Sequence, residues 1–158
     1  ALVSKAKSIG EPAKILANVL EVNMDMGYFA SQKISQLCSK KSKITILGLA
    51  FKPDTDDIRE SPSLKIIEHL KDNYEVVVHD PIAELPDNLK GSVKFTKNLK
   101  EALHESSLAV VVTSWNEYRS LSDKVTKDMK DAKVLDTRGL LSSNKFKKTA
   151  YYLLGYNR

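Results

Sequence analysis

The sequence has a single cysteine, Cys38, and this scarcity excludes two kinds of structure. One thiol cannot close a disulfide within the chain, and it cannot build a metal site of clustered cysteines. The three histidines show no metal-ligand spacing with Cys38 or with one another. Cys38 lies inside a helical pattern, where an inert thiol is the default. We therefore expect no metal site and assign Cys38 no catalytic role.

Long apolar runs are also missing. No stretch approaches the ~18 apolar residues of a membrane span, and no signal peptide begins the chain, so we expect no membrane partner. The 158 residues, 42% hydrophobic and 28% charged, suffice for one cored domain and a short appendage. The net charge of +5 comes from scattered lysines without interleaved aromatic residues, so we expect no nucleic-acid partner.

The first 40 residues have apolar side chains at helical spacing. They predict a short helix ending near Ile9 and a longer one over residues 12–39, with Gly27 as its weak point. The longer helix carries more apolar surface than a lone appendage should. It either packs on another chain or on a further part of this one, or it lies across the main domain.

From residue 43 onward, apolar strands alternate with helical segments. Such alternation implies a parallel sheet with right-handed crossovers, and therefore an α/β, Rossmann-like doubly wound domain over residues 42–158 after a helical segment over residues 1–41. Strands are predicted at 44–49, 74–78, 93–95, 108–113, 133–136 and 151–154. Helices are predicted from residue 62 and over 98–105, 122–130 and 144–148.

A polar loop over residues 51–60 follows the first predicted strand and leads to a helix that Ser61 and Pro62 should open. Lys52 and Arg59 lie in this loop among four acidic residues. A helix N-terminus with two cations beside it favours an anion, and phosphate is the natural candidate. The alternative is a surface loop whose charges satisfy one another.

Ligands of such a domain bind at the carboxyl ends of the strands. Gly48 is the only glycine near the first strand end, so the three-glycine dinucleotide fingerprint is absent. Asp80 ends the second strand where a ribose-binding acid would lie, but an Asp before Pro is also a common turn starter, and we favour the turn. Arg138, after the strand that ends at Asp136, could face the same cleft as Lys52, or form a surface ion pair.

Asp54 and Asp56 form a D-x-D pair, the pattern that aspartate-nucleophile phosphatases use with Mg²⁺. Lys52 and Pro53 separate the pair from the strand. The acids more plausibly hold the loop and Arg59, so the phosphatase remains a minor alternative.

The run GLAFKPDTDDIRESPSL over residues 48–64 closely resembles the opening of the C-terminal domain in the UDP-glucose/GDP-mannose dehydrogenase family. The resemblance extends through the VHDP, TSW and DTR segments that begin at Val78, Thr113 and Asp136. It implies NAD-dependent oxidation of the C6 alcohol of a nucleotide sugar to a carboxylate. The first substrate choice is UDP-glucose, oxidised to UDP-glucuronate, with UDP-N-acetylmannosamine and UDP-N-acetylgalactosamine as alternatives.

The resemblance also implies roles for individual residues. Phe51, Lys52 and Arg138 would bind the UDP-sugar, and Arg59 would reach NAD held mainly by another domain. The helix around Asn23 would belong to the dimer interface, which implies a cytoplasmic homodimer.

The sequence holds neither the family's GGxCxPKD-like segment, which carries its catalytic cysteine, nor a G-x-G-x-x-G domain. We therefore expect a C-terminal fragment that does not catalyse oxidation alone. The rival interpretation is a stand-alone nucleotide-binding module.

Overall fold

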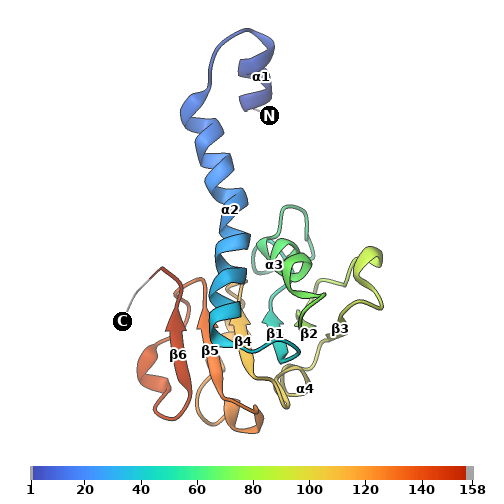
Figure 1. Ribbon diagram of the computed structural model, residues 1–158, viewed down its shortest axis with the longest axis vertical. Helices are drawn as coiled ribbons and strands as arrows, with labels where there is room; N and C mark the ends of the chain where they lie inside the picture. The colour runs from blue at the N-terminus through green and yellow to red at the C-terminus, as the bar shows by residue number, and fades with distance from the viewer. Residues whose placement is uncertain (1, 156–158) are drawn as a thin grey trace.

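The short apolar segments form the strands of one parallel sheet in the computed structural model of the protein, which describes residues 2–155. The outer ends of the two predicted units, Ala1 and residues 156–158, lie outside the described residues. The sheet has the strand order β3-β2-β1-β4-β5-β6 (Figure 1). This order is that of a doubly wound dinucleotide-binding fold and confirms the predicted α/β class. The strands are β1 Lys43–Leu47, β2 Glu75–His79, β3 Lys94–Thr96, β4 Leu108–Val111, β5 Lys133–Asp136 and β6 Ala150–Leu153.

The core lies on both faces of the central strands. Ile46 of β1 aligns with Val78 of β2 on one side and with Val110 of β4 on the other, and all three are fully buried. Strands covered on both faces read as continuous apolar runs, which is why LAVV of β4 gave a clear signal in the sequence. Thr45 of β1 is a buried polar side chain in this core, and its hydroxyl donates to the carbonyl of Ala102 at 2.7 Å.

Two short helices connect strands, and each begins at a side-chain cap, of which the one at Ser61 was predicted. Helix α3, Pro62–Leu70, starts at Ser61, whose hydroxyl accepts from the N–H of Ser63. Helix α4, Leu99–Leu103, starts at Asn98, whose amide oxygen accepts from the N–H of Glu101. Each cap satisfies a backbone donor that a helix start leaves free.

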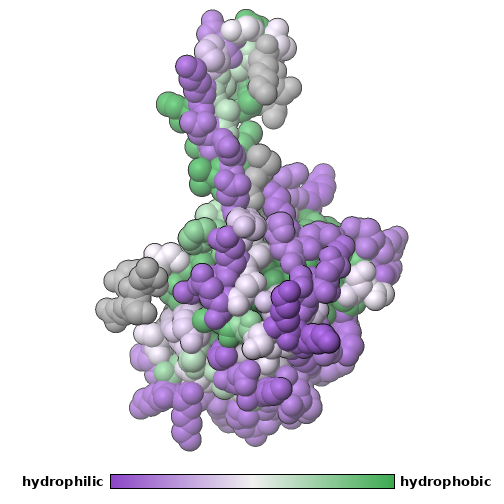
Figure 2. Space-filling view, in the orientation of Figure 1, coloured by the Kyte–Doolittle hydropathy of each residue, from purple (hydrophilic) through white to green (hydrophobic). Residues whose placement is uncertain are grey.

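The long predicted helix is present as α2, Lys14–Leu37, and it passes through Gly27 without a break. The short helix before it, α1, Leu2–Ser8, folds back beside the N-terminal part of α2 (Figure 1). The second half of α2 packs against α3 and the sheet, whereas its first half projects away from the domain. Apolar atoms lie along this projecting part in Figure 2. The exposed apolar side chains of α2 include Ile15, Leu16, Val19, Leu20, Val22 and Phe29.

The predicted helix over residues 122–130 is wrong, since only a single 3₁₀ turn, Thr126–Asp128, forms there. Long-range hydrogen bonds replace the helical ones. The carbonyl of Asp128 accepts from the N–H of Glu105, and the N–H of Lys130 donates to the carbonyl of Ser106. Residues 144–148 likewise contribute only to a 3₁₀ turn, Ser143–Lys145. The remaining 3₁₀ turns are Asp87–Leu89 and Asn116–Ser120.

Candidate functional site

A cleft of about 730 Å³ lies at the carboxyl ends of the strands. Its walls come from α2, from the loop after β1, from the first turn of α3 and from the segments that follow β4, β5 and β6. In this strand order the chain turns in opposite directions from β1 and from β4, and ligands of doubly wound sheets bind at that switch point. We therefore take this cleft as the candidate site. Its lining residues include Asn23, Phe51, Glu60, Lys65, Thr137 and Arg138.

The start of α3 is tied closely to the end of β1. The buried hydroxyl of Ser63 donates to the carbonyl of Gly48 at 2.5 Å, so the first turn of α3 is held against the strand end. Pro62, at the first helical position, lines the cleft. The partial positive charge of the α3 N-terminus is thus fixed at the cleft, as the sequence analysis expected of an anion site.

Phe51 and Arg138 lie in the same cleft although 87 positions separate them in the chain. The ring of Phe51 is 51% exposed, a large fraction for an aromatic side chain that has the core beside it. Asp136 shapes the turn that carries Arg138, because its carboxylate accepts from the backbone N–H of Arg138 and of Leu141. Among residues 2–155, the guanidinium of Arg138 has no hydrogen-bond or ion-pair partner. The alternative of a surface ion pair at Arg138 is therefore not found among these residues, and the charge is available to an anion.

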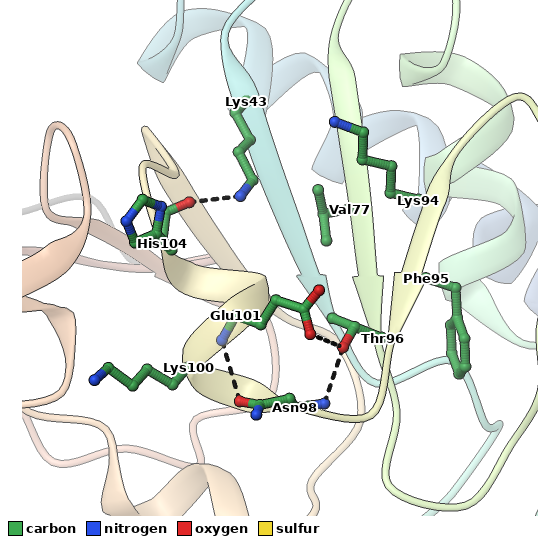
Figure 3. A pocket seen from close by; sticks show the side chains of 9 residues that line it. All are labelled: Lys43, Val77, Lys94, Phe95, Thr96, Asn98, Lys100, Glu101 and His104. Atoms are coloured by element: carbon green, nitrogen blue, oxygen red, sulfur yellow. Dashed lines mark hydrogen bonds between the residues drawn. The ribbon is translucent and has the colours of Figure 1, made fainter.

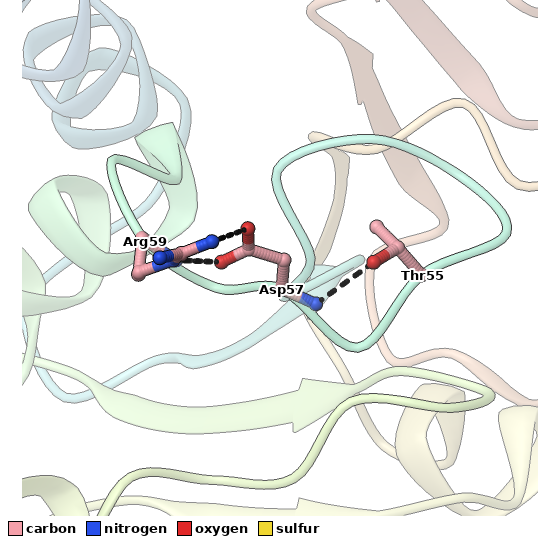
Figure 4. Close-up of polar contacts among 3 residues, drawn as sticks. All are labelled: Thr55, Asp57 and Arg59. Atoms are coloured by element: carbon pink, nitrogen blue, oxygen red, sulfur yellow. Dashed lines mark hydrogen bonds and ion pairs between the residues drawn. The ribbon is translucent and has the colours of Figure 1, made fainter.

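The other two predicted site residues do not line the cleft. Lys52 is exposed in the loop directly after Phe51. Arg59 points to solvent, with 86% of its side chain exposed, and its guanidinium forms two hydrogen bonds with Asp57, at 2.9 and 2.7 Å (Figure 4). These bonds, with a smaller contribution from Lys52, lower the pKa of Asp57 to about 2. For Arg59 and Asp57 the alternative interpretation is correct, in which the charges of a surface loop pair with one another.

Asp80 is fully buried and accepts hydrogen bonds from five N–H groups. Two of the donors, the backbone N–H groups of Ile82 and Ala83, belong to the turn that Asp80 itself begins. The predicted turn is therefore confirmed. The role of ribose-binding acid is wrong for Asp80, because both carboxylate oxygens are enclosed and used within the protein.

Three further cleft residues had no distinct signal in the sequence. Asn23 reaches the cleft from α2, whereas Glu60 and Lys65 flank the start of α3. The stem of Lys65 lies against Gly27, since a Cβ built on that glycine would come within 2.8 Å of the Cβ of Lys65. Gly27 thus allows the close crossing of two helices that brings Lys65 and α2 to one cleft, which no local pattern could reveal.

A second hollow, of about 490 Å³, lies beside β3 and α4 (Figure 3). Several of its polar groups are already paired. Lys43 donates to the carbonyl of His104, Thr96 donates to Glu101, and Lys94 forms an ion pair with Glu75. This hollow therefore offers less to a charged ligand than the cleft does.

Metal binding, membrane spanning and thiol chemistry can also be judged from the described part of the chain. Across residues 2–155, no three His, Cys, Asp or Glu side chains gather in a way that could hold a metal ion. Within the same residues, no helix has the length and hydropathy needed to cross a membrane. Cys38 is buried, and this burial raises the pKa of its thiol, which agrees with an inert side chain.

Comparison with known proteins relates the chain to a protein family. Residues 45–143 match the model of the UDP binding domain of the UDP-glucose/GDP-mannose dehydrogenase family. The chain is 31% identical over 157 residues to a UDP-glucose 6-dehydrogenase of Bacillus subtilis, a match that covers 96% of this chain and 34% of the relative. It is 39% identical over 121 residues to a UDP-N-acetyl-D-mannosamine dehydrogenase of Campylobacter jejuni, covering 72% of this chain and 30% of that one.

The fold agrees with a solved structure of the same kind. The structure of a UDP-glucose dehydrogenase from Pyrobaculum islandicum superposes with a TM-score of 0.81 at 28% identity and covers 96% of this chain and 34% of that protein. The chain spans about a third of the length of the curated relatives that it matches.

Proposed function

The chain belongs to the UDP-glucose/GDP-mannose dehydrogenase family, and on this premise we propose that it binds the UDP-sugar substrate of an NAD-dependent dehydrogenase. The reaction is oxidation of the C6 alcohol of the sugar to a carboxylate. Residues 42–158 would form the UDP-sugar-binding domain, and residues 1–41 would belong to a central helical dimerisation domain. The protein would work in the cytoplasm.

The observation that carries the proposal is the cleft that joins Phe51 and Arg138. The guanidinium of Arg138 has no partner in the part of the chain that the structure describes, and its planar fork suits a phosphate or ribose. The N-terminus of α3 adds partial positive charge, and Phe51 offers an apolar ring. Lys52, directly after Phe51, would supply a further charge to the diphosphate, and Arg59 would reach NAD.

UDP-glucose is the substrate we favour, with UDP-glucuronate as the product. The relatives divide between UDP-glucose and UDP-N-acetylmannosamine dehydrogenases at similar identity, which makes the N-acetylated sugar the second candidate. UDP-N-acetylgalactosamine is a further alternative. All three share the UDP group that the cleft would recognise.

The family's chemistry needs a catalytic cysteine and an NAD domain. The 158-residue chain has only Cys38, which is buried. We therefore propose that the chain alone does not oxidise UDP-glucose. Formation of NADH from UDP-glucose and NAD⁺ by the pure chain would contradict this.

The exposed apolar residues on the first half of α2 support a homodimer through this helix. Side chains such as Ile15 and Val22, which are 80% and 59% exposed, would be covered by the second subunit. Light scattering of the pure chain tests this, with Ile15→Glu expected to shift the mass toward a monomer. A wild-type chain that remains monomeric at high concentration would contradict it.

Calorimetric titration of the chain with UDP tests the central proposal, with GDP and NAD⁺ as controls. We expect measurable UDP binding that is tighter than binding of either control. Equal affinity for GDP, or no UDP binding, would contradict a UDP-sugar site built by this chain. A stand-alone nucleotide-binding module would bind UDP equally well, and an upstream reading frame that encodes the NAD domain and the cysteine segment would decide between the two.

A further inference from the structure

The carboxylate of Asp80 connects three loops at the carboxyl edge of the sheet, and its two oxygens serve different loops. Oδ1 accepts from the N–H groups of Ile82 and Ala83, at 2.9 and 2.8 Å, and so forms the turn after β2. Oδ2 accepts from the N–H groups of Leu49 and Ala50 after β1, at 2.7 and 3.0 Å. One side chain therefore sets how the ends of β1 and β2 lie relative to each other.

The third loop enters through Trp115, the only tryptophan in the chain. Its indole N–H donates to Oδ2 of Asp80 at 3.1 Å, and its side chain is only 5% exposed. Trp115 follows β4, the strand on the other side of β1. The donors to Asp80 thus come from the ends of β1, β2 and β4, three adjacent strands.

No cation takes part in this arrangement among the described residues, since the donors to Asp80 are four backbone N–H groups and one indole N–H. A buried carboxylate is stable only when its oxygens are satisfied, and leaving one donor unmatched is costly in a dry interior. All five contacts therefore have to form together, which gives the three loops one common geometry.

This geometry leads directly to the cleft. Leu49 and Ala50 immediately precede Phe51, whose ring lines the cleft. The carbonyl of Ala50 is fixed as well, because it accepts from the hydroxyl of Thr113 at 2.7 Å. Both the N–H and the carbonyl of Ala50 are thus hydrogen-bonded, and this fixes the direction of the backbone that leads into Phe51 and Lys52.

We propose that Asp80 and Trp115 are positioning residues, which set the Phe51–Lys52 segment for the UDP group without touching it. The inference rests on the proposed function, because the segment matters only if the cleft binds UDP. Ligand affinity depends on how well a site is organised before binding. Loosening the Asp80 contacts should therefore weaken UDP binding even in protein that is fully folded.

Trp115→Phe is the main test, since it keeps an aromatic ring and removes the N–H donor to Asp80 together with part of the indole volume. We expect calorimetry on the folded variant to show UDP affinity reduced about five-fold, the size of effect usual for one hydrogen bond. Hydrogen exchange should be faster at the amides of Leu49 and Ala50 than in the wild type, while the amide of Val110 in the middle of β4 stays protected. Asp80→Asn puts an amide donor against N–H donors, so we expect a larger loss of affinity or of folding.

Thr126→Val is the matched control. Thr126 is fully buried and shares a hydrogen bond of 2.7 Å with Thr149, at a position that does not line the cleft. Val has nearly the same shape, so this variant loses the bond to Thr149 and the bond that the Thr126 hydroxyl donates to the carbonyl of Ser122 at 3.1 Å, and its stability should fall as well. We expect its UDP affinity to equal that of the wild type, which separates positioning from stability.

The UDP-binding function of the chain and the positioning role of Asp80 and Trp115 can be overturned separately. Absence of UDP binding by the wild-type chain would overturn the proposed function and the positioning role with it. If the wild type binds UDP and Trp115→Phe binds it equally well, the positioning role alone is overturned. Equal losses of affinity in Trp115→Phe and Thr126→Val would also overturn it, because the effect would then follow general stability.

Discussion

Thr113 lies where a side chain on Gly48 would have to be. A Cβ built on Gly48 would come within 2.3 Å of the Cβ and 2.5 Å of the Oγ1 of Thr113, and Gly48 has a φ of +100°. The end of β1 therefore approaches the end of β4 more closely than any side chain at this position allows. Gly48 does not serve a dinucleotide fingerprint here. It permits the contact between Thr113 and the carbonyl of Ala50.

Gly48→Ala should consequently destabilise the protein strongly. Backbone strain and overpacking each cost about 1–3 kcal/mol, so we expect the free energy of unfolding to fall by roughly 2–6 kcal/mol in urea titrations. Gly91→Ala is the control, because Gly91 also has a positive φ, of +84°, but nothing lies within 4 Å of its Cβ position. Similar losses in the two variants would show that the close approach to Thr113 is unimportant.

The strands were predicted correctly and the helix over residues 122–130 was not, and this difference shows what the sequence could reveal. Local signals placed the strands, the Ser61 cap and the parallel sheet correctly, because apolar periodicity and capping are properties of neighbouring residues. The pairing of Asp128 with Glu105 and of Lys130 with Ser106 is tertiary, and it overrides the helical pattern. No window of neighbouring residues contains that information.

The features of the candidate site also fall into those that the sequence could predict and those that depend on packing between distant residues. Sheet topology alone suggested that Arg138 faces the cleft, and the structure places it in the same cleft as Phe51. The approach of Lys65 to Gly27 depends on the crossing of two helices, and the burial of Asp80 depends on three loops meeting. Such features follow from packing at a distance, so the sequence could name Asp80 as a turn residue but not as a connection between loops.

Lys52→Ala tests the charge that follows Phe51. If the ammonium group contacts the diphosphate, UDP binding should weaken by about 1–3 kcal/mol in calorimetry, as for other charged hydrogen bonds. Lys100→Ala is the control, since Lys100 is an exposed lysine of α4 that does not line the cleft. Unchanged affinity in Lys52→Ala would remove Lys52 from the site.

Arg138→Lys tests whether the planar fork or only the charge is used. Lysine keeps the positive charge but cannot bond two oxygens side by side, so we expect weaker UDP binding in calorimetric titrations. The backbone of the turn should be unaffected, because Asp136 bonds the N–H of residue 138 and not its side chain. Equal affinity of the lysine variant would mean that only charge acts at this position.

The ion pair of Arg59 and Asp57 predicts a pH dependence that NMR can follow. Its hydrogen bonds lower the pKa of Asp57 to about 2, so the carboxylate should stay charged until the pH falls far below the usual range. In Arg59→Gln the carboxyl resonance of Asp57 should titrate closer to 3.8, the ordinary pKa of an aspartate side chain. Arg138→Gln is the control and should leave the titration of Asp57 unchanged. A wild-type midpoint near 3.8 would show that the pair does not persist in solution.

His79 predicts a pH dependence of stability itself. It is fully buried, with Nδ1 2.9 Å from the hydroxyl of Tyr118 and Nε2 3.3 Å from the carbonyl of Lys97. Burial lowers the pKa of His79, against a smaller opposing effect of Glu117. The folded protein therefore keeps the imidazole neutral at pH values where the unfolded chain, with a pKa of about 6.5, takes up a proton.

The sign of the effect follows from this difference. Above about pH 6.5 neither state is protonated at His79, and the free energy of unfolding does not depend on the group. As the pH falls below that value, the unfolded state binds the additional proton and the folded state becomes less stable. Hydrogen bonds from basic side chains lower the pKa of Asp57 and of Glu75. Such carboxylates change the stability only as the pH falls toward and below about 4, where the acids of the unfolded chain take up protons, and so they lie outside this window.

Urea unfolding at pH 7.5 and pH 5.5 measures the effect. The wild type should lose more stability between the two pH values than His79→Gln, which has no titrating group at this position. His104→Gln is the control, because His104 is exposed, and this variant should keep the wild-type pH dependence. Identical losses in the wild type and in His79→Gln would contradict the argument, since they would show that the buried imidazole takes up a proton as readily in the folded protein as in the unfolded chain.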